Sequence, residues 1–189
     1  SKPGDPAMVG FARTAKISGL LPAREPADVI RARRMDYFRS MAAGQGPRLA
    51  VIEDIDYPNC IAGWWGEVHV AVHKGLGQVG AITNGVMRDL DVMDAGFPVL
   101  AGSIGPSHGF VHVVEIGGPV SLMGMHISQD ELMHADRHGA IVIPNEIIAD
   151  LKQAIETVIA NEAIVLGPAR APGFDIERLE KVWAEFEAA

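Results

Sequence analysis

Residues 64–89 read WWGEVHVAVHKGLGQVGAITNGVMRD, and this stretch contains two patterns that indicate different folds. Gly75, Gly77 and Gly80 match the G-x-G-x-x-G pattern of a dinucleotide-binding loop. Such a loop leads into a helix whose N-terminal amides hold the pyrophosphate. Residues 81–85 instead read AITNG, which predicts a strand and a turn. We therefore interpret the glycines as places where the chain turns tightly before a central strand.

The second pattern is the Arg88-Asp89 pair, which follows the same apolar strand. Ligands of α/β sheets commonly bind beyond the carboxyl ends of the strands, where this pair is expected. The planar guanidinium group of Arg88 suits a carboxylate or a 2-oxo acid. The carboxylate of Asp89 is a hard oxygen ligand for Mg²⁺ or Mn²⁺. An ion pair that only caps the turn is the structural alternative, and the residue types leave both interpretations open.

The bulk composition narrows the class of protein. The chain has 189 residues, 48% of them hydrophobic and 21% charged, so it is expected to form a globular fold without disulfides or structural metal. Its net charge of −8 argues against a nucleic-acid partner, because phosphate binding requires a basic face. We interpret the cluster of Arg31, Arg33 and Arg34 as a solvated helix face.

A single cysteine, Cys60, excludes a disulfide within the chain and favours a reducing compartment. We interpret Cys60 as a structural residue rather than a nucleophile. The N-terminal stretch SKPGDPAMVG lacks the apolar core of a secretion signal, and no apolar run approaches about 18 residues. The expectation is a cytoplasmic protein that does not span a membrane.

Hydrophobic periodicity and turn residues predict mixed strands and helices. The predicted strands cover residues 8–17, 48–55, 79–85 and 97–104, with further short strands between residues 111 and 144. Helices are predicted over residues 25–44 with Asp28 as cap, 145–164 with Asn145 as cap, and 176–189, with a helical turn at 90–96. Alternation alone predicts a strand over residues 68–73.

Several segments together resemble one known family. Residues 64–89 resemble its "WGE…A…G…G.V.DG.vRD" core, and residues 134–144, HADRHGAIVIP, are similar to its "hADrdGvvviP" segment. GFPVLAGSIGP (96–106) and VGFARTAKI (9–17) match as well, in the family order. One branch of this family comprises divalent-metal 4-hydroxy-4-methyl-2-oxoglutarate aldolases that are also oxaloacetate decarboxylases. The other comprises the regulators of ribonuclease activity A.

The resemblance implies an α/β fold: a single domain of the swivelling β/β/α type, with a central sheet flanked by helices and a β-rich second half. We assign residues 1–166 to this domain and residues 167–189 to a C-terminal linker and helix. The family pattern makes residues 66–76 a helix, against the strand that alternation predicts. It also implies a homotrimer or homohexamer with its sites at subunit interfaces.

The resemblance further implies a site for a small 2-oxo acid substrate. Arg88 would bind the acid, Asp89 would hold a divalent metal cation (Mg²⁺ or Mn²⁺) largely through water, and Glu67 would lie near that water shell. These three are the expected catalytic residues. The residues that would hold the pyruvyl part, chiefly through backbone N–H groups, are Gly66, Glu67, Val68 and His69.

Such a site fits a lyase. Retro-aldol cleavage of a 4-hydroxy-2-oxo acid and decarboxylation of oxaloacetate both leave a pyruvate enolate, whose charge a metal and Arg88 would stabilise. A Schiff-base route needs a desolvated lysine, and none of the five lysines has a convincing site context.

Two departures from the aldolase pattern keep a second function open. Val92 stands where the aldolase branch carries an acid, with Asp91 one place early. The aldolases also use a C-terminal acid from a neighbouring subunit, for which Glu177, Glu180 and Glu185 are candidates. The alternative is a non-catalytic protein-binding regulator that inhibits a ribonuclease.

Two histidine groups suggest other metal sites. His69 and His73 share one face if residues 66–76 are helical, but no third zinc ligand is placed by the sequence. His134, Asp136 and His138 have the residue types of a metal cluster. We interpret the latter group as a turn in which Asp136 bonds its own backbone and Gly139 takes a positive φ.

Overall fold

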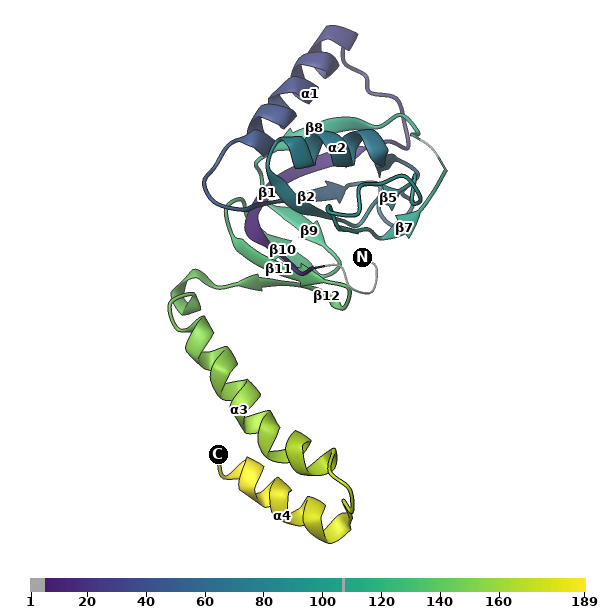
Figure 1. Cartoon of the computed structure of the whole chain (residues 1–189). Helices are drawn as coiled ribbons and strands as arrows, with labels where there is room; N and C mark the ends of the chain where they lie inside the picture. The colour runs from purple at the N-terminus through teal and green to yellow at the C-terminus, as the bar shows by residue number, and fades with distance from the viewer. Residues whose placement is uncertain (1–5, 107) are drawn as a thin grey trace. The chain divides into compact units, whose positions relative to one another are not determined.

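The computed structural model describes residues 6–106 and 108–189, and the chain divides into two compact units, Ser1–Ile143 and Pro144–Ala189 (Figure 1). The first unit is a mixed α/β domain with a β-rich second half, as the sequence predicts. Its elements are β1 (Met8–Ser18), α1 (Ala27–Ala42), β2 (Arg48–Asp54), β3 (Gly63–Trp65), α2 (Glu67–Gly75), β4 (Gln78–Thr83), β5 (Val86–Met87), β6 (Val99–Leu100), β7 (Ser103–Ile104), β8 (His112–Ile116), β9 (Val120–Leu122), β10 (Met125–Ile127), β11 (Leu132–Asp136) and β12 (Gly139–Ile143).

The main sheet is built around β1. This strand runs parallel to β2 from Phe11 to Ile17, and on its other edge it pairs antiparallel first with β11 and then with β8. The strand order is β12-β11-β1-β2-β4-β6, with β8 beside the end of β1. A small parallel sheet, β3-β5-β7, and the hairpin β9-β10 lie outside it. β1 therefore joins the parallel half of the sheet to the antiparallel half.

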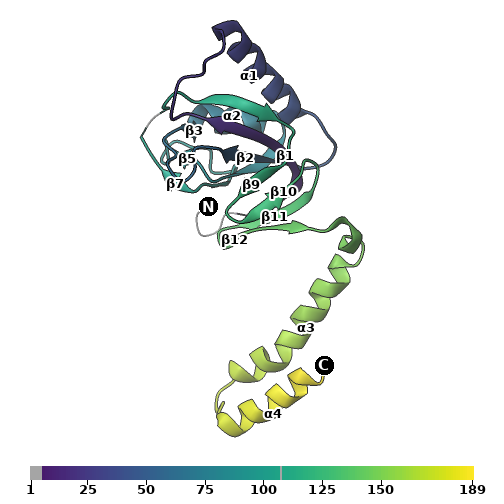
Figure 2. The same ribbon diagram turned by 180° about the vertical axis from the view of Figure 1, so that it is seen from behind.

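The sheet separates two apolar cores. Ala50 and Ile52 of β2 belong to the core that contains side chains of α1 and α2, whereas Leu49 and Val51 belong to the core that contains side chains of β9 and β10. Figures 1 and 2 show both helices on one side of the sheet and the hairpin on the other. Because side chains alternate along a strand, β2 contributes to both cores, which explains its continuous apolar sequence.

Residues 67–75 form the helix α2, as the resemblance implies, and the strand that alternation predicts over residues 68–73 is wrong. Val70 and His73 are buried, while Val68 and Val72 are exposed. Buried positions three residues apart are the pattern of a helix on a core. Val68, Val70 and Val72 give the alternating pattern of a strand, but only Val70 is buried.

The helix predicted over residues 25–44 is confirmed as α1, which buries Tyr37 and Met41. Asp28 does not cap it, because the helix begins directly after Pro26 and no side chain accepts a hydrogen bond from its first turn. Residues 90–96 form turns and no helix.

The strand predicted over residues 97–104 is two strands in two sheets, β6 and β7. Between them, a Cβ atom on Gly102 would lie 2.1 Å from the carbonyl oxygen of Asn84, so this crossing requires a glycine.

The second unit contains η1 (Asn145–Ile147), α3 (Leu151–Ala169) and α4 (Ile176–Glu187). Asn145 does not cap the long helix, which begins after Asp150. Residue 166, where we expect the first domain to end, lies within α3, and the two compact units meet between Ile143 and Pro144. Among the described residues, no helix combines the length and the apolar character needed to cross a membrane.

The hairpin β9-β10 turns through Met123 and Gly124, both at positive φ (+50° and +87°). A two-residue turn of this kind favours Asn-Gly, because a longer side chain is strained at positive φ. We expect Met123→Asn to raise the free energy of unfolding by about 1 kcal/mol. Urea unfolding followed by tryptophan fluorescence measures this, and Met123→Leu, which keeps the strain, is the matched control. If Met123→Asn is no more stable than Met123→Leu, the backbone at residue 123 is not strained.

Candidate functional site

Arg88 and Asp89 follow β5, the central strand of the small sheet, and lie beside the start of α2. The backbone N–H of Arg88 donates to the carbonyl oxygen of Trp65 at 2.8 Å, which continues the pairing of β5 with β3. The Arg88 Nε–H donates to the carbonyl oxygen of Gly63 at 3.2 Å. These contacts fix the pair against the segment that leads into α2.

Asp89 caps the N-terminus of α2. Its Oδ2 accepts a hydrogen bond from the backbone N–H of Glu67 at 3.2 Å and also forms an ion pair with Nη1 of Arg88. A helix start leaves its first N–H groups without acceptors in the helix, and a carboxylate there also offsets the positive end of the helix dipole. Asp89 itself has φ of +59°, which a short polar residue tolerates best.

Gly66 allows this approach because it has no side chain. A Cβ atom at this position would lie 2.6 Å from Oδ2 of Asp89 and 2.8 Å from Cζ of Arg88. Its φ of −162° is extended backbone that any residue adopts, so space and not backbone conformation requires the glycine. The sequence predicts Gly66 as a substrate-binding residue, and the structure gives it this packing role.

The ion pair between Arg88 and Asp89, the structural alternative that the residue types leave open, is formed. It is not deeply buried, because the side chains are 14% and 30% exposed. Nη2 of Arg88 and Oδ1 of Asp89 make no hydrogen bond with any described residue. Nε and Nη1 of Arg88 and Oδ2 of Asp89 are therefore committed to the fold, which leaves Nη2 and Oδ1 for a ligand.

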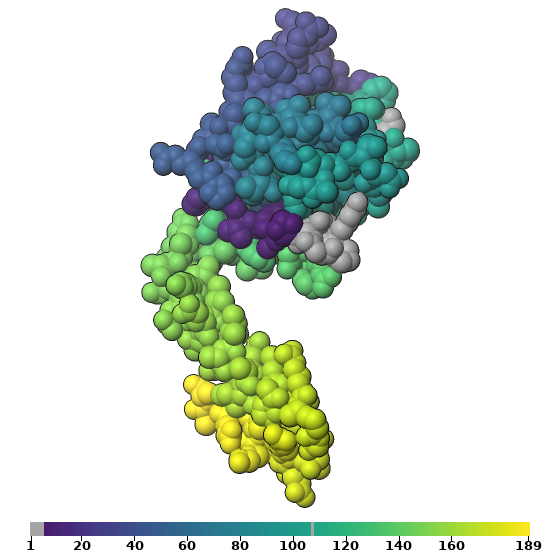
Figure 3. Space-filling view, in the orientation of Figure 1, coloured from purple at the N-terminus to yellow at the C-terminus, as the bar shows by residue number. Residues whose placement is uncertain are grey.

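The remaining predicted site residues form the first turn of α2. Glu67 and Val68 are exposed and His69 is half-buried. The first hydrogen bond within the helix is from the N–H of Val70 to the carbonyl oxygen of Gly66, at 2.9 Å. The N–H groups of Val68 and His69 therefore have no acceptor within the helix. In Figure 3, the blue-to-teal segments that include α2 form much of the face of the first unit turned toward the viewer.

The positions that depart from the aldolase pattern are all exposed. Val92 is 59% exposed in the turn after Asp89, with its N–H bonded to the carbonyl oxygen of Asp89 at 3.1 Å. Asp91 is exposed in the same turn. Glu177, Glu180 and Glu185 lie on α4 in the second unit and are exposed.

An aromatic cluster packs beneath the first turns of α2. His69 lies edge-on to Trp64, with ring centroids 4.1 Å apart, and His73 lies 4.6 Å from Trp65. Both tryptophans are buried, so both belong to the core rather than to a ligand surface. The hydroxyl of Tyr37 donates to Nε2 of His73 at 2.6 Å, and Nδ1–H of His73 donates to the carbonyl oxygen of His69 at 2.6 Å.

Both nitrogens of His73 are therefore used in the fold, which explains why His69 and His73 do not form a zinc pair. Among the described residues, no three His, Cys, Asp or Glu side chains are grouped so that they could hold a metal ion. Burial lowers the pKa of His73 to about 4, and burial followed by the charge of His73 lowers the pKa of His69 to about 3.

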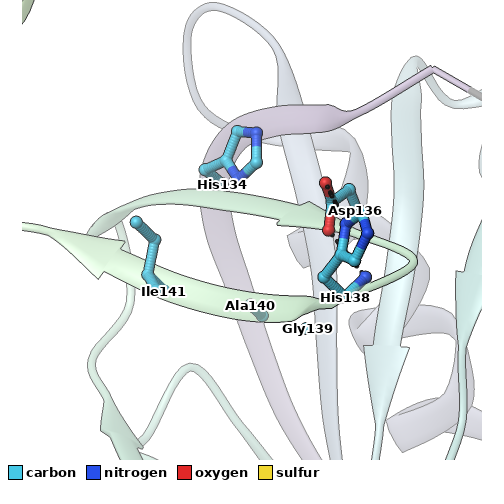
Figure 4. A pocket seen from close by; sticks show the side chains of 6 residues that line it. All are labelled: His134, Asp136, His138, Gly139, Ala140 and Ile141. Carbon is cyan, nitrogen blue, oxygen red and sulfur yellow. Dashed lines mark hydrogen bonds and ion pairs between the residues drawn. The ribbon is translucent and has the colours of Figure 1, made fainter. Parts of the chain in front are cut away.

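His134, Asp136 and His138 are likewise not grouped as a set of metal ligands. They line a cavity of about 230 Å³ (Figure 4). Oδ1 of Asp136 accepts from the backbone N–H of His138 at 2.8 Å, and Oδ2 lies 3.1 Å from its Nδ1. These bonds lower the pKa of Asp136, the backbone bond most. Gly139 has φ of +144°. The group is a turn, as we interpreted it from the sequence.

Cys60 lies half-buried beside Asp54 at the end of β2. Burial, with the nearby charge of Asp54, raises the pKa of the thiol to about 12. The thiol is therefore protonated at neutral pH and does not act as a nucleophile. This supports the structural interpretation that the sequence suggested.

The reactivity of Cys60 tests that environment. At pH 8 we expect iodoacetamide to alkylate the folded protein about 1,000-fold more slowly than the urea-unfolded chain, because the thiolate fraction falls with the rise in pKa. Mass spectrometry follows the single cysteine without ambiguity. Equal rates in the two states would contradict the buried, protonated thiol.

The pKa of His73 predicts acid sensitivity. The folded-state pKa of about 4 lies below the ordinary 6.5, so the unfolded chain binds a proton that the folded protein does not. The contribution of His73 to stability is present above pH 6.5 and is lost as the pH falls toward 4, at up to about 1.4 kcal/mol per pH unit.

Urea unfolding between pH 7 and pH 4.5 measures this slope. In His73→Gln, whose amide can make similar hydrogen bonds without titrating, we expect the slope to fall by about one proton. An unchanged slope would show that His73 is not the group that titrates.

Comparison with known proteins identifies the family. A family model described as RraA-like, Aldolase/RraA, matches residues 2–142, all but the two end residues of the first unit. A search of curated proteins finds no match.

Among solved structures, one titled as novel cellulases from microbes associated with the gut ecosystem has a TM-score of 0.67 and 23% identity, covering 82% of this chain and 68% of that one. An uncharacterized protein from Pseudomonas syringae pv. tomato has a TM-score of 0.68 and 22% identity, covering 97% and 78%. RraAS2 of Streptomyces coelicolor, described as an unusual member of the RNase ES inhibitor RraA family, has a TM-score of 0.65 and 21% identity, covering 84% and 76%. At these identities the likeness shows a common fold. From the family model and this fold, the chain belongs to the RraA-like family, which includes both aldolases and ribonuclease inhibitors.

Proposed function

We propose that the protein is a divalent-metal-dependent lyase acting on 2-oxo acids, by retro-aldol cleavage of 4-hydroxy-2-oxo acids such as 4-hydroxy-4-methyl-2-oxoglutarate, by decarboxylation of oxaloacetate, or both. One observation carries the proposal: Arg88, Asp89 and the open N-terminal turn of α2 meet at the surface, each with a free hydrogen-bonding atom. A lyase that leaves a pyruvate enolate needs this combination of positive charge and donors beside a carboxylate.

The first step is binding of the 2-oxo acid. Nη2 of Arg88 would donate to the substrate, and the free N–H groups of Val68 and His69 would bind its carboxylate at the positive end of α2. The ion pair with Asp89 and the bond to Gly63 hold the guanidinium group in place, so little freedom is lost on binding. As charge develops on the carbonyl oxygen, the same Arg88 donor would stabilise it.

A metal ion fits this site only with a water-rich shell. Asp89 offers Oδ1, and Mg²⁺ commonly binds through one or two carboxylates while keeping several waters. The absence of a three-residue metal cluster among the described residues speaks against a zinc centre. When bound, the ion would act as a Lewis acid on the carbonyl group. Glu67 provides a second carboxylate at the start of α2, and we assign it to hydrogen bonding with that water shell.

Val92 favours the second candidate, a non-catalytic regulator that binds a ribonuclease. An exposed valine stands where the aldolase branch carries an acid, and it adds an apolar side chain to the surface beside Asp89. The net charge of −8 is compatible with either function. We further propose a homotrimer or homohexamer for both candidates, which sedimentation equilibrium measures directly.

Pyruvate release distinguishes the two functions. We expect turnover of oxaloacetate or 4-hydroxy-4-methyl-2-oxoglutarate with Mg²⁺ or Mn²⁺ and none with EDTA, measured by coupling pyruvate to lactate dehydrogenase. Arg88→Ala should lower kcat by about 100-fold or more, as expected for the loss of a donor to the developing charge.

Asp89→Asn is the sharper variant, because its amide oxygen still caps α2 and Asn tolerates positive φ. It should fold normally yet lose metal-dependent turnover. Arg39→Ala, which removes an exposed arginine paired with Asp36 on α1, is the matched control and should retain activity. No pyruvate from either compound with either metal would contradict the lyase and favour the regulator.

A further inference from the structure

A pocket of about 350 Å³ lies on the side of the sheet away from α1 and α2, among residues that the proposed reaction does not use. Its lining includes Ile82 of β4, Leu100 of β6, Met123 and Met125 of the β9-β10 hairpin, and Arg137 and His138 of the β11-β12 turn. These residues come from four segments far apart in the sequence. The pocket is therefore a product of the fold and not of one local motif.

The floor of this pocket is apolar. Ile82 is 1% exposed and belongs to the second core, and Leu100 and Met125 pack against that core. Methionine side chains are flexible and adapt to apolar ligands of different shapes. The described residues that line the pocket include no acidic side chain.

The rim carries a positive charge without a partner. Arg137 is exposed, and its guanidinium group makes no hydrogen bond or ion pair with any described residue. The neighbouring His138 is also exposed and contacts Asp136, which lies outside this lining. The pocket thus combines an apolar floor with one arginine side chain at its mouth that has no partner among the described residues. A guanidinium fork is suited to bind a carboxylate.

Met123 adds a second, independent observation. It occupies the turn position where Asn is favoured, at φ of +50°, and its side chain is 58% exposed at the pocket. Both the strained backbone and the exposed apolar side chain are unfavourable for the free protein. Strain of this kind is found at ligand-binding positions, where a contact with the ligand offsets it.

We propose that this pocket binds a small apolar monocarboxylate, with its hydrocarbon chain against Ile82, Leu100 and Met125, its carboxylate on Arg137, and Met123 closing over the chain. The site is separate from Arg88 and Asp89 and does not depend on the function proposed for them. A ligand of this class needs no metal, and binding involves no covalent step.

Hexanoate is the probe for the experiment. In protein labelled with ¹³C at the methionine methyl groups, titration with hexanoate should shift the Met123 and Met125 signals in a saturable way. Hexanol, which keeps the chain without the charge, should bind about tenfold more weakly, as should hexanoate to Arg137→Gln. Arg31→Gln removes the same charge from the exposed face of α1 and should leave the affinity unchanged.

The turn variants test the closing role of Met123. Met123→Leu should retain binding, whereas Met123→Asn should bind more weakly, although its turn is less strained. The proposal is overturned if hexanoate leaves the Met123 and Met125 signals unmoved, if Arg137→Gln binds as well as the wild type, or if hexanol binds equally well. It is also overturned if these signals shift with protein concentration alone, because that result makes this face a contact between copies of the chain.

Discussion

The pairing of β1 with three other strands is the constraint on which the first unit depends. β2 follows β1 along most of its length, and β11 and β8 share its opposite edge. Without this strand, the parallel strands β2, β4 and β6 would no longer be joined to the antiparallel strands β8, β11 and β12. Both cores also take side chains from β1: Ala15 and Ile17 on one face, Met8 and Ala12 on the other. β1 therefore contributes side chains to the apolar cores on both faces of the sheet.

Much of the fold is predictable from the sequence where the signal is local. The apolar run of β2 and the helix α1 have strong periodic patterns, and both form as expected. The errors occur where a distant contact decides the structure. α2 depends on a cap from Asp89, which lies 22 residues after Glu67 in the chain. The division between β6 and β7 depends on the close approach of Gly102 to Asn84.

The candidate site shows the same limit. That Arg88 and Asp89 are neighbours is evident in the sequence, and the family resemblance adds the start of α2. Neither indicates that Asp89 caps that helix, or that Gly66 is needed for space rather than for its backbone conformation. Periodic sequence patterns predict single helices and strands, but they do not show which side chains of different elements lie close together. The apolar pocket cannot be predicted from the sequence at all, because none of the four segments that line it carries a binding motif by itself.

The second unit has a consequence for how the chain loses its structure. Among its described residues, Val182 is the only buried apolar side chain, while Ile155, Val158 and Ile159 of α3 are exposed. Two helices that exclude so little surface from water gain little to offset the entropy of ordering them. We infer that this unit frays before the β1 ladder does. A partner that covers Ile155, Val158 and Ile159 would therefore stabilise the helical form of α3 over its unfolded form. Its binding would be accompanied by an increase in the helix content of the chain.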